Sequence, residues 1–196
     1  MPRDVHDDQL SEKPQAARPS PVRSAVIGVT VSATILVVLV HRATPVTAIG
    51  LGLLVVFAGW LSVIDFEQHR LPNRIIGPLT GAVTVVVVLA GLVNDDLGRS
   101  GRALLIGLAA SIVMLVGNLI GGMGMGDVKY AFPLAATLGW FGLSPVLAGA
   151  LVMAFTGGLA ALVVLIIGKG RGHRLAYGPF MSLGLIGGLL TAAPGV

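Results

Sequence analysis

Long apolar stretches alternate with short charged segments along this chain. Six stretches contain no Asp, Glu, Lys or Arg and span residues 24–40, 43–64, 75–94, 103–126, 130–168 and 175–196. A helix needs about 20 apolar residues to cross the hydrocarbon core of a bilayer. Five of the stretches are near this length, so each of them predicts one membrane crossing.

The stretch 130–168 is too long for a single crossing. Its 39 residues, at about 1.5 Å each, would span nearly twice a hydrocarbon core of about 30 Å. We predict two helices that separate within residues 139–145, where glycine and proline favour a turn and two aromatic residues suit a membrane interface. The predicted fold class is all-α, a polytopic membrane helix bundle of about seven transmembrane helices. The fifth helix is predicted to be the shortest. If it does not fully span the membrane, the number of transmembrane helices is six.

The composition agrees with a membrane protein. Hydrophobic residues make up 55% of the 196 residues and charged residues 11%, whereas a soluble domain carries about 25% charged residues. The basic residues are scattered between apolar runs, which indicates a role in orienting the chain rather than nucleic-acid binding. The absence of cysteine excludes disulfides, thiolate metal sites and a cysteine nucleophile.

The distribution of basic residues predicts the orientation of the chain. With a cytoplasmic N-terminus, ten of the 13 basic residues fall on the cytoplasmic side and three on the outside, in agreement with the positive-inside rule. We therefore expect a multi-pass protein of the cytoplasmic (inner) membrane with an external C-terminus. Asn94, Asp95, Asp96, Arg99 and Arg102 are predicted to form an external loop.

The N-terminal segment differs from the rest. Residues 1–23 contain four prolines and almost no large apolar side chains, which predicts a disordered cytoplasmic tail. Residues 24–196 then form the membrane-embedded domain. A cleaved signal peptide is the alternative for residues 24–40, but the preceding segment is long and the apolar run exceeds the usual signal core.

Two aspartates lie at predicted membrane edges on the cytoplasmic side. Asp65 ends the uncharged stretch 43–64, and Asp127 follows a glycine-rich run over residues 121–126. Ionisable groups in or beside a membrane span are costly, so each suggests a function. Two carboxyls at one depth suggest an aspartic protease pair, one protonated and one ionised, that activates a water and protonates the leaving amine. The alternative is that both aspartates merely cap helices.

Glycine occupies four of the six positions before the second aspartate: Gly121, Gly122, Gly124 and Gly126. The missing side chains would let an extended substrate backbone approach the carboxylate of Asp127. Non-helical backbone at this depth is tolerated only where it is buried in protein or lines a wet cavity. A phosphate-binding loop is not indicated, because the run follows a membrane helix and lacks a Gly-Lys-Ser/Thr ending.

Three segments, in order, resemble motifs of the type IV prepilin leader peptidase family. Residues 65–73, Asp-Phe-Glu-Gln-His-Arg-Leu-Pro-Asn, are similar to its first aspartate motif, which ends in Leu/Ile-Pro-Asn. Residues 124–129, Gly-Met-Gly-Asp-Val-Lys, resemble its Gly-x-Gly-Asp signature, and residues 177–180, Tyr-Gly-Pro-Phe, resemble the Phe-Gly-Pro-Phe segment that opens a late helix. Presenilin-like proteases share the Gly-x-Gly-Asp tetrad, so the resemblance rests on all three motifs together. It covers residues 46–190.

The resemblance implies cleavage of short, basic leader peptides from type IV prepilins or pseudopilins at the cytoplasmic membrane face, typically after a glycine. It makes Asp65 and Asp127 the catalytic pair of a peptidase domain over residues 24–196, with no metal or other cofactor. Residues implied to bind the substrate or shape the site are Gly124, Gly126, Lys129, Leu71, Pro72, Asn73, Gly178, Pro179 and Phe180. The implied partners are the prepilin, membrane lipids and the pilus assembly machinery.

The chain departs from the long bifunctional members of that family. It has no large N-terminal cytoplasmic domain and no cysteine quartet for zinc, which puts their methyltransferase activity in doubt. It looks instead like the stand-alone peptidases of tight-adherence pilus systems.

The remaining polar residues have plainer interpretations. Asp65, Glu67 and His69 alternate as metal ligands can, but no fourth partner follows in the sequence, and metal sites usually need three or four protein ligands. Lys129 could pair with an aspartate or with a lipid phosphate. Close to Asp127, its charge would favour the ionised carboxylate.

Two other functions remain open from the sequence. A small proton-coupled transporter also uses membrane carboxylates, but it would place them near the middle of the bilayer, often in repeated halves. An inactive scaffold of a pilus or secretion machine is the second alternative. The presence of both aspartate motifs argues against it.

Overall fold

The computed structural model describes residues 33, 50, 52, 54–59, 61, 73–120, 124–166 and 177–192. All regular structure among these residues is helical. The helices bounded within them are α3 (Asn73–Val93), α4 (Leu97–Ile120), α5 (Met125–Phe141), α6 (Leu143–Ile166) and α7 (Gly178–Thr191). Three spans, Ile75–Val93 in α3 and the whole of α4 and α6, are long and apolar enough to cross a membrane. The chain is therefore an all-α membrane helix bundle, as predicted.

The predicted break within residues 139–145 is confirmed. Helix α5 ends at Phe141, α6 begins at Leu143, and Gly142 alone connects them. Gly142 has φ of 121°, a left-handed conformation that glycine adopts without steric cost. Its N–H donates to the Gly139 carbonyl at 3.2 Å, which closes the last turn of α5.

The predicted external loop is shorter than expected. The connection between α3 and α4 is confined to residues 94–96, and α4 begins at Leu97, so Arg99 and Arg102 lie in its first turns. The Asp96 carboxylate accepts the Arg99 backbone N–H at 2.8 Å, the bond by which a helix start is capped. Placing both arginines in the loop was wrong, because this capping starts the helix ahead of them.

Arg99 also stabilises the far end of α5. Its Nε donates to the Trp140 carbonyl at 2.8 Å, and its guanidinium lies 4.8 Å from the centroid of the Trp140 ring. Cations are favourable at a helix C-terminus, where carbonyls are left without intrahelical partners. A single side chain therefore joins the start of α4 to the end of α5.

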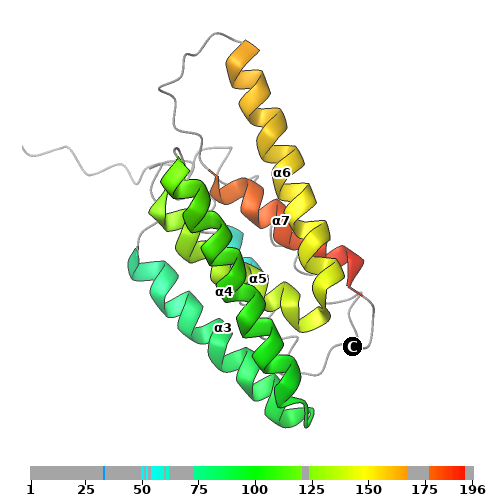
Figure 1. The fold of residues 1–196 in the computed structure, drawn as a ribbon. Helices are drawn as coiled ribbons and strands as arrows, with labels where there is room; N and C mark the ends of the chain where they lie inside the picture. The colour runs from blue at the N-terminus through cyan, green and yellow to red at the C-terminus, as the bar shows by residue number, and fades with distance from the viewer. Residues whose placement is uncertain are drawn as a thin grey trace, which may run out of the picture.

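Helix α5 is the centre of the bundle. Twelve of its 17 residues are buried, against three each in the longer α4 and α6. It packs against α3, α4, α6 and α7, and Figure 1 shows α3 and α4 on one side of it and α6 and α7 on the other. Helix α7 has only 14 residues, so the expectation that the fifth predicted crossing is the shortest was wrong.

Small residues allow the helices to pack closely. A Cβ atom added at Gly149 of α6 would lie 2.7 Å from the Gly184 carbonyl oxygen of α7, and one added at Gly184 would lie 2.6 Å from the Gly149 carbonyl oxygen. A Cβ atom added at Gly107 of α4 would lie 2.9 Å from the Phe132 carbonyl oxygen of α5. Such contacts between backbones are typical of helix pairs in membranes.

The outer faces of α4 and α6 are apolar and exposed. Leu105, Val113 and Leu119 of α4 are 67%, 67% and 77% exposed, and Leu151 and Phe155 of α6 are 71% and 74% exposed. Continuous apolar surface of this kind is unfavourable in water. Such faces are typical of helices that cross a membrane.

Helices α6 and α7 are antiparallel and aligned at one end. Gly188 near the end of α7 lies against Pro145 at the start of α6, while Tyr177 and Phe180 at the start of α7 lie near Gly157. Helix α6 continues beyond this point to Ile166. Figure 1 shows α6 projecting past the start of α7.

Candidate active site

Asp127 is buried at the start of the central helix. It lies in the first turn of α5 and is 7% exposed. Its Oδ2 accepts the backbone N–H of Gly124 at 3.1 Å, and its own N–H donates to the Gly124 carbonyl at 3.0 Å. The helix-cap interpretation is therefore realised in part. A carboxylate has about four lone-pair sites, so a cap bond and other contacts can be made by the same group.

Gly124 keeps the space beside this carboxylate open. It precedes α5 in an extended conformation, with φ of −73° and ψ of 144°, which any residue can adopt. A Cβ atom at this position would lie 3.2 Å from Asp127 Oδ2, closer than such contacts normally are. A side chain at position 124 would therefore press against the carboxylate of Asp127.

The other residues of the signature lie on the helix. The sequence suggested a non-helical glycine run up to the aspartate. In the structure, Gly126 already belongs to the first turn of α5. Lys129 is exposed, whereas Asp127 is buried. Residues two apart on a helix do not face each other, so Lys129 extends from a different face of α5.

The third motif opens a helix, as the resemblance implied. Helix α7 begins at Gly178, with Tyr177 before it and Pro179 in its first turn. The rings of Tyr177 and Phe180 meet edge to face, with centroids 6.2 Å apart and planes at 75°.

The first turns of α5 and α7 lie side by side. The Tyr130 hydroxyl, one turn after Asp127, lies 3.1 Å from Ser182 Oγ, and Ser182 is one turn after Gly178. The second and third motifs therefore share one end of the bundle.

The first motif falls outside the described residues, apart from its last member. Asn73 is the first residue of α3, and Asp65, Leu71 and Pro72 lie in the part of the chain that the structure does not describe. Leu61 belongs to the hydrophobic core and is fully buried. Asp65 follows it by four residues, so extended chain could carry it at most about 14 Å from Leu61.

A metal centre has no support among the described residues. Within them, no three His, Asp or Glu side chains lie close enough together to hold an ion. Glu67 and His69, the sequence candidates beside Asp65, are not among the residues described.

Sequence reasoning missed Tyr130 and Ser182. Both are buried, at 0% and 9% exposure, and they are 52 residues apart in the chain. The spacing of Tyr130 from Asp127 was a usable signal, because residues three apart lie on one helix face. No comparable signal marked Ser182.

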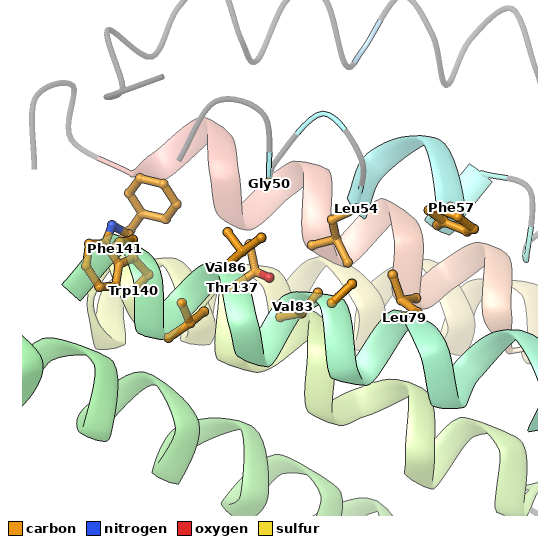
Figure 2. Close-up of a pocket in the computed structure, with 12 residues that line it drawn as sticks. Gly50, Leu54, Phe57, Leu79, Val83, Val86, Thr137, Trp140 and Phe141 are labelled. Carbon is orange, nitrogen blue, oxygen red and sulfur yellow. The ribbon is translucent and has the colours of Figure 1, made fainter. Parts of the chain in front are cut away.

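An apolar cavity of about 60 Å³ lies elsewhere in the bundle, between α3, α5 and residues 50–57 (Figure 2). Leu54, Phe57, Val83 and Trp140 line it together with Thr137, whose hydroxyl is bonded to the Pro133 carbonyl of its own helix. Thr137 is ten residues beyond the aspartate, about 15 Å along α5. Its described lining is almost entirely apolar and lies far from Asp127, so it offers no group that resembles the candidate site.

The comparisons with known proteins point to one family. The model of the type IV leader peptidase family matches residues 52–166, which is more than half of the chain. This range includes both aspartates, together with the glycine signature before the second. No curated protein and no solved structure matches the chain.

Proposed function

Since the chain belongs to the type IV leader peptidase family, we propose that it is an intramembrane aspartic endopeptidase. It removes basic leader peptides from type IV prepilins or pseudopilins at the cytoplasmic face of the inner membrane. Asp65 and Asp127 form the catalytic pair, and no metal or other cofactor takes part. Lipids surround the bundle, and the pilus assembly machinery receives the product.

The observation that carries this proposal is the setting of Asp127. A carboxyl that is 7% exposed sits at the start of the central helix, beside a glycine whose replacement would crowd it. Burial of an ionisable group is costly, and structures keep such groups where they have a function. The start of α7, with Gly178, lies at the same end of the bundle.

The chemistry requires the two carboxyls to differ in protonation. Like charges a few ångströms apart cannot both ionise, so the pair holds one proton between them. The ionised carboxyl accepts a proton from water as the water attacks the scissile carbonyl, and the protonated carboxyl supplies a proton for the leaving amine. The burial of Asp127 at the start of α5 supports this role, and Asp65 is proposed as its partner from the motif.

The direct experiment is cleavage of a prepilin by the purified full-length protein in detergent or liposomes. We expect a shortened product whose new N-terminus, read by mass spectrometry, follows the basic leader. Absence of cleavage with several prepilins of different leader sequence would contradict the proposal.

The glycine before the cleaved bond provides a prediction about the substrate. Replacing it with leucine should lower the rate of cleavage strongly, because a bulky side chain would compete for the space that Gly124 leaves beside Asp127. The matched control replaces a leader residue several positions upstream with leucine. Equal cleavage of both substrates would contradict the close approach of substrate backbone to this glycine.

The orientation can be tested because the chain contains no cysteine. Single cysteines at Glu67 and Arg171 should react with an impermeant thiol reagent only from the cytoplasmic side, and one at Asp96 only from outside. The reason is the bias of ten basic residues to three across the predicted membrane sides. Labelling at Glu67 from outside would contradict the predicted orientation and the proposed cytoplasmic position of the site.

Two other functions give different outcomes in the same assays. A proton-coupled transporter would move a solute in liposomes and leave prepilins intact. An inactive scaffold would support pilus assembly with both aspartates replaced.

A further inference from the structure

Tyr130 is the largest fully buried side chain in the described part of the chain. It is three residues after Asp127 on α5, and side chains at this spacing lie one above the other on the same helix face. Its hydroxyl lies 3.1 Å from Ser182 Oγ of α7. A hydroxyl bond between two helices therefore begins one turn from the aspartate.

The direction of this bond follows from the other contacts of Ser182. Its Oγ is 3.2 Å from the Ala58 carbonyl oxygen and 3.1 Å from the Gly178 carbonyl oxygen. Both carbonyls can only accept, and the serine hydroxyl has a single proton to give. Since the Ser182 hydroxyl donates to these carbonyls, the Tyr130 hydroxyl is positioned to donate to Ser182 Oγ, and the contacts form one hydroxyl network.

These bonds join the three parts of the chain that carry the three motifs. Ala58 lies on the helical segment 54–59, seven residues before Asp65 in the sequence. Tyr130 lies on α5, which carries Asp127 in its first turn, and Ser182 lies on α7, which the third motif opens. Ala58 and Ser182 are 1% and 9% exposed, so the junction is shielded from solvent.

The hydrogen bonds of this junction are buried, which increases their effect on the relative position of the helices. In surroundings of low dielectric, hydrogen bonds strengthen and a lost partner cannot be replaced by water. The surrounding contacts between helices are apolar and fix packing distance better than axial register, since hydrophobic contact is non-directional. Hydroxyl bonds between helices can supply the missing directionality.

We propose that Tyr130 and Ser182 form a positioning pair that fixes the α5 helix against segment 54–59 and α7, and so sets the separation of the two catalytic carboxyls. This proposal rests on the function proposed above. Neither residue is proposed to contact the substrate. Both act by holding Asp127 and the segment that leads to Asp65 at one level.

Kinetics of Tyr130→Phe provide the first test, because phenylalanine keeps the ring and removes only the donor. We expect kcat for prepilin cleavage to fall about tenfold to a hundredfold, because small misplacements of reacting groups lower rates by such factors. KM should be nearly unchanged. The double variant Tyr130→Phe/Ser182→Ala should lose no more than Tyr130→Phe, because the two act as one unit. It also separates loss of the Tyr130–Ser182 bond from the cost of leaving one partner behind, because both hydroxyls are removed together.

The matched control is Thr137→Val, also on α5. Thr137 is buried, but its hydroxyl bonds only the Pro133 carbonyl of its own helix, at 2.8 Å. Its removal should leave kcat and KM unchanged. A wild-type kcat in Tyr130→Phe, or an equal loss in Thr137→Val, would overturn the positioning role.

A second readout does not depend on activity. In Asp65→Cys/Asp127→Cys, the only two thiols of the chain should be joined by a short bifunctional thiol reagent. Adding Tyr130→Phe should slow this cross-linking, while adding Thr137→Val should not. An unchanged rate with Tyr130→Phe would overturn the proposal, whereas failure of the proposed function would appear separately, as cleavage that survives Asp127→Asn.

Discussion

Asp127→Asn should abolish prepilin processing while the protein still inserts and folds. An amide can neither accept the proton of the attacking water nor hold the shared proton. The loss should be roughly a thousandfold or more, because general acid and base catalysis alone contributes about 10²–10⁴-fold. Asp65→Asn should have the same effect, and the double variant should be no worse than either single one.

Three variants serve as controls for this result. Asp96→Asn changes an aspartate at the other end of the bundle, where the carboxylate caps α4, and should leave processing intact. Glu67→Gln and His69→Ala should also keep most activity, since they are proposed as loop residues without a metal. Processing that persists in Asp127→Asn, with normal expression on an immunoblot, would contradict the assignment as an aspartic protease.

Gly149→Ala should destabilise the bundle by about 1–3 kcal/mol, the usual cost of forcing an extra group into a packed interface. The new methyl would lie 2.7 Å from the Gly184 carbonyl oxygen and 2.8 Å from Leu138 Cδ1. Because the nearest atom is backbone, α6 and α7 must separate to admit it. The free energy of unfolding can be measured by SDS titration in mixed micelles.

Gly158→Ala is the matched control, on the same helix nine residues later. A Cβ atom there meets nothing within 4 Å, so the free energy of unfolding should change by less than about 0.5 kcal/mol. Equal effects of the two substitutions would mean that loss of glycine in α6, rather than contact with α7, determines the stability.

The sequence predicted individual helices better than their packing. Length and charge spacing located α3 to α7, and glycine with proline located the turn at Gly142. Which faces meet could not be predicted, because in lipid an outward face is as apolar as an inward one. The buried helix α5 and the largely exposed helix α6 therefore look alike in their residues, although twelve positions are buried in one and three in the other.

The candidate site was predictable only where its residues are contiguous. The glycine signature marked Asp127 as a candidate at a membrane edge, but not that it lies in the first turn of a helix, and Tyr-Gly-Pro-Phe marked the start of α7. The junction of Tyr130 with Ser182 depends on how α5 and α7 pack, which no local pattern reports. The start of α4 was misplaced for a local reason, the cap that Asp96 provides to Arg99.

The alignment of α6 with α7 has a consequence for the supply of water. Helix α7 starts beside Gly157, and α6 continues nine residues further, to Ile166, which is about 13 Å. With 14 residues, α7 itself is about 21 Å long, shorter than a hydrocarbon core of about 30 Å. Helix α7 is therefore too short to cross such a core by itself. The start of α7 is closed by its own cap, because the N–H groups of Phe180 and Met181 both donate to the Tyr177 carbonyl at 3.1 Å. If the bundle crosses a bilayer, we expect water to reach the start of α7 more easily than the middle of α6, and this is the end of the bundle where Asp127 lies.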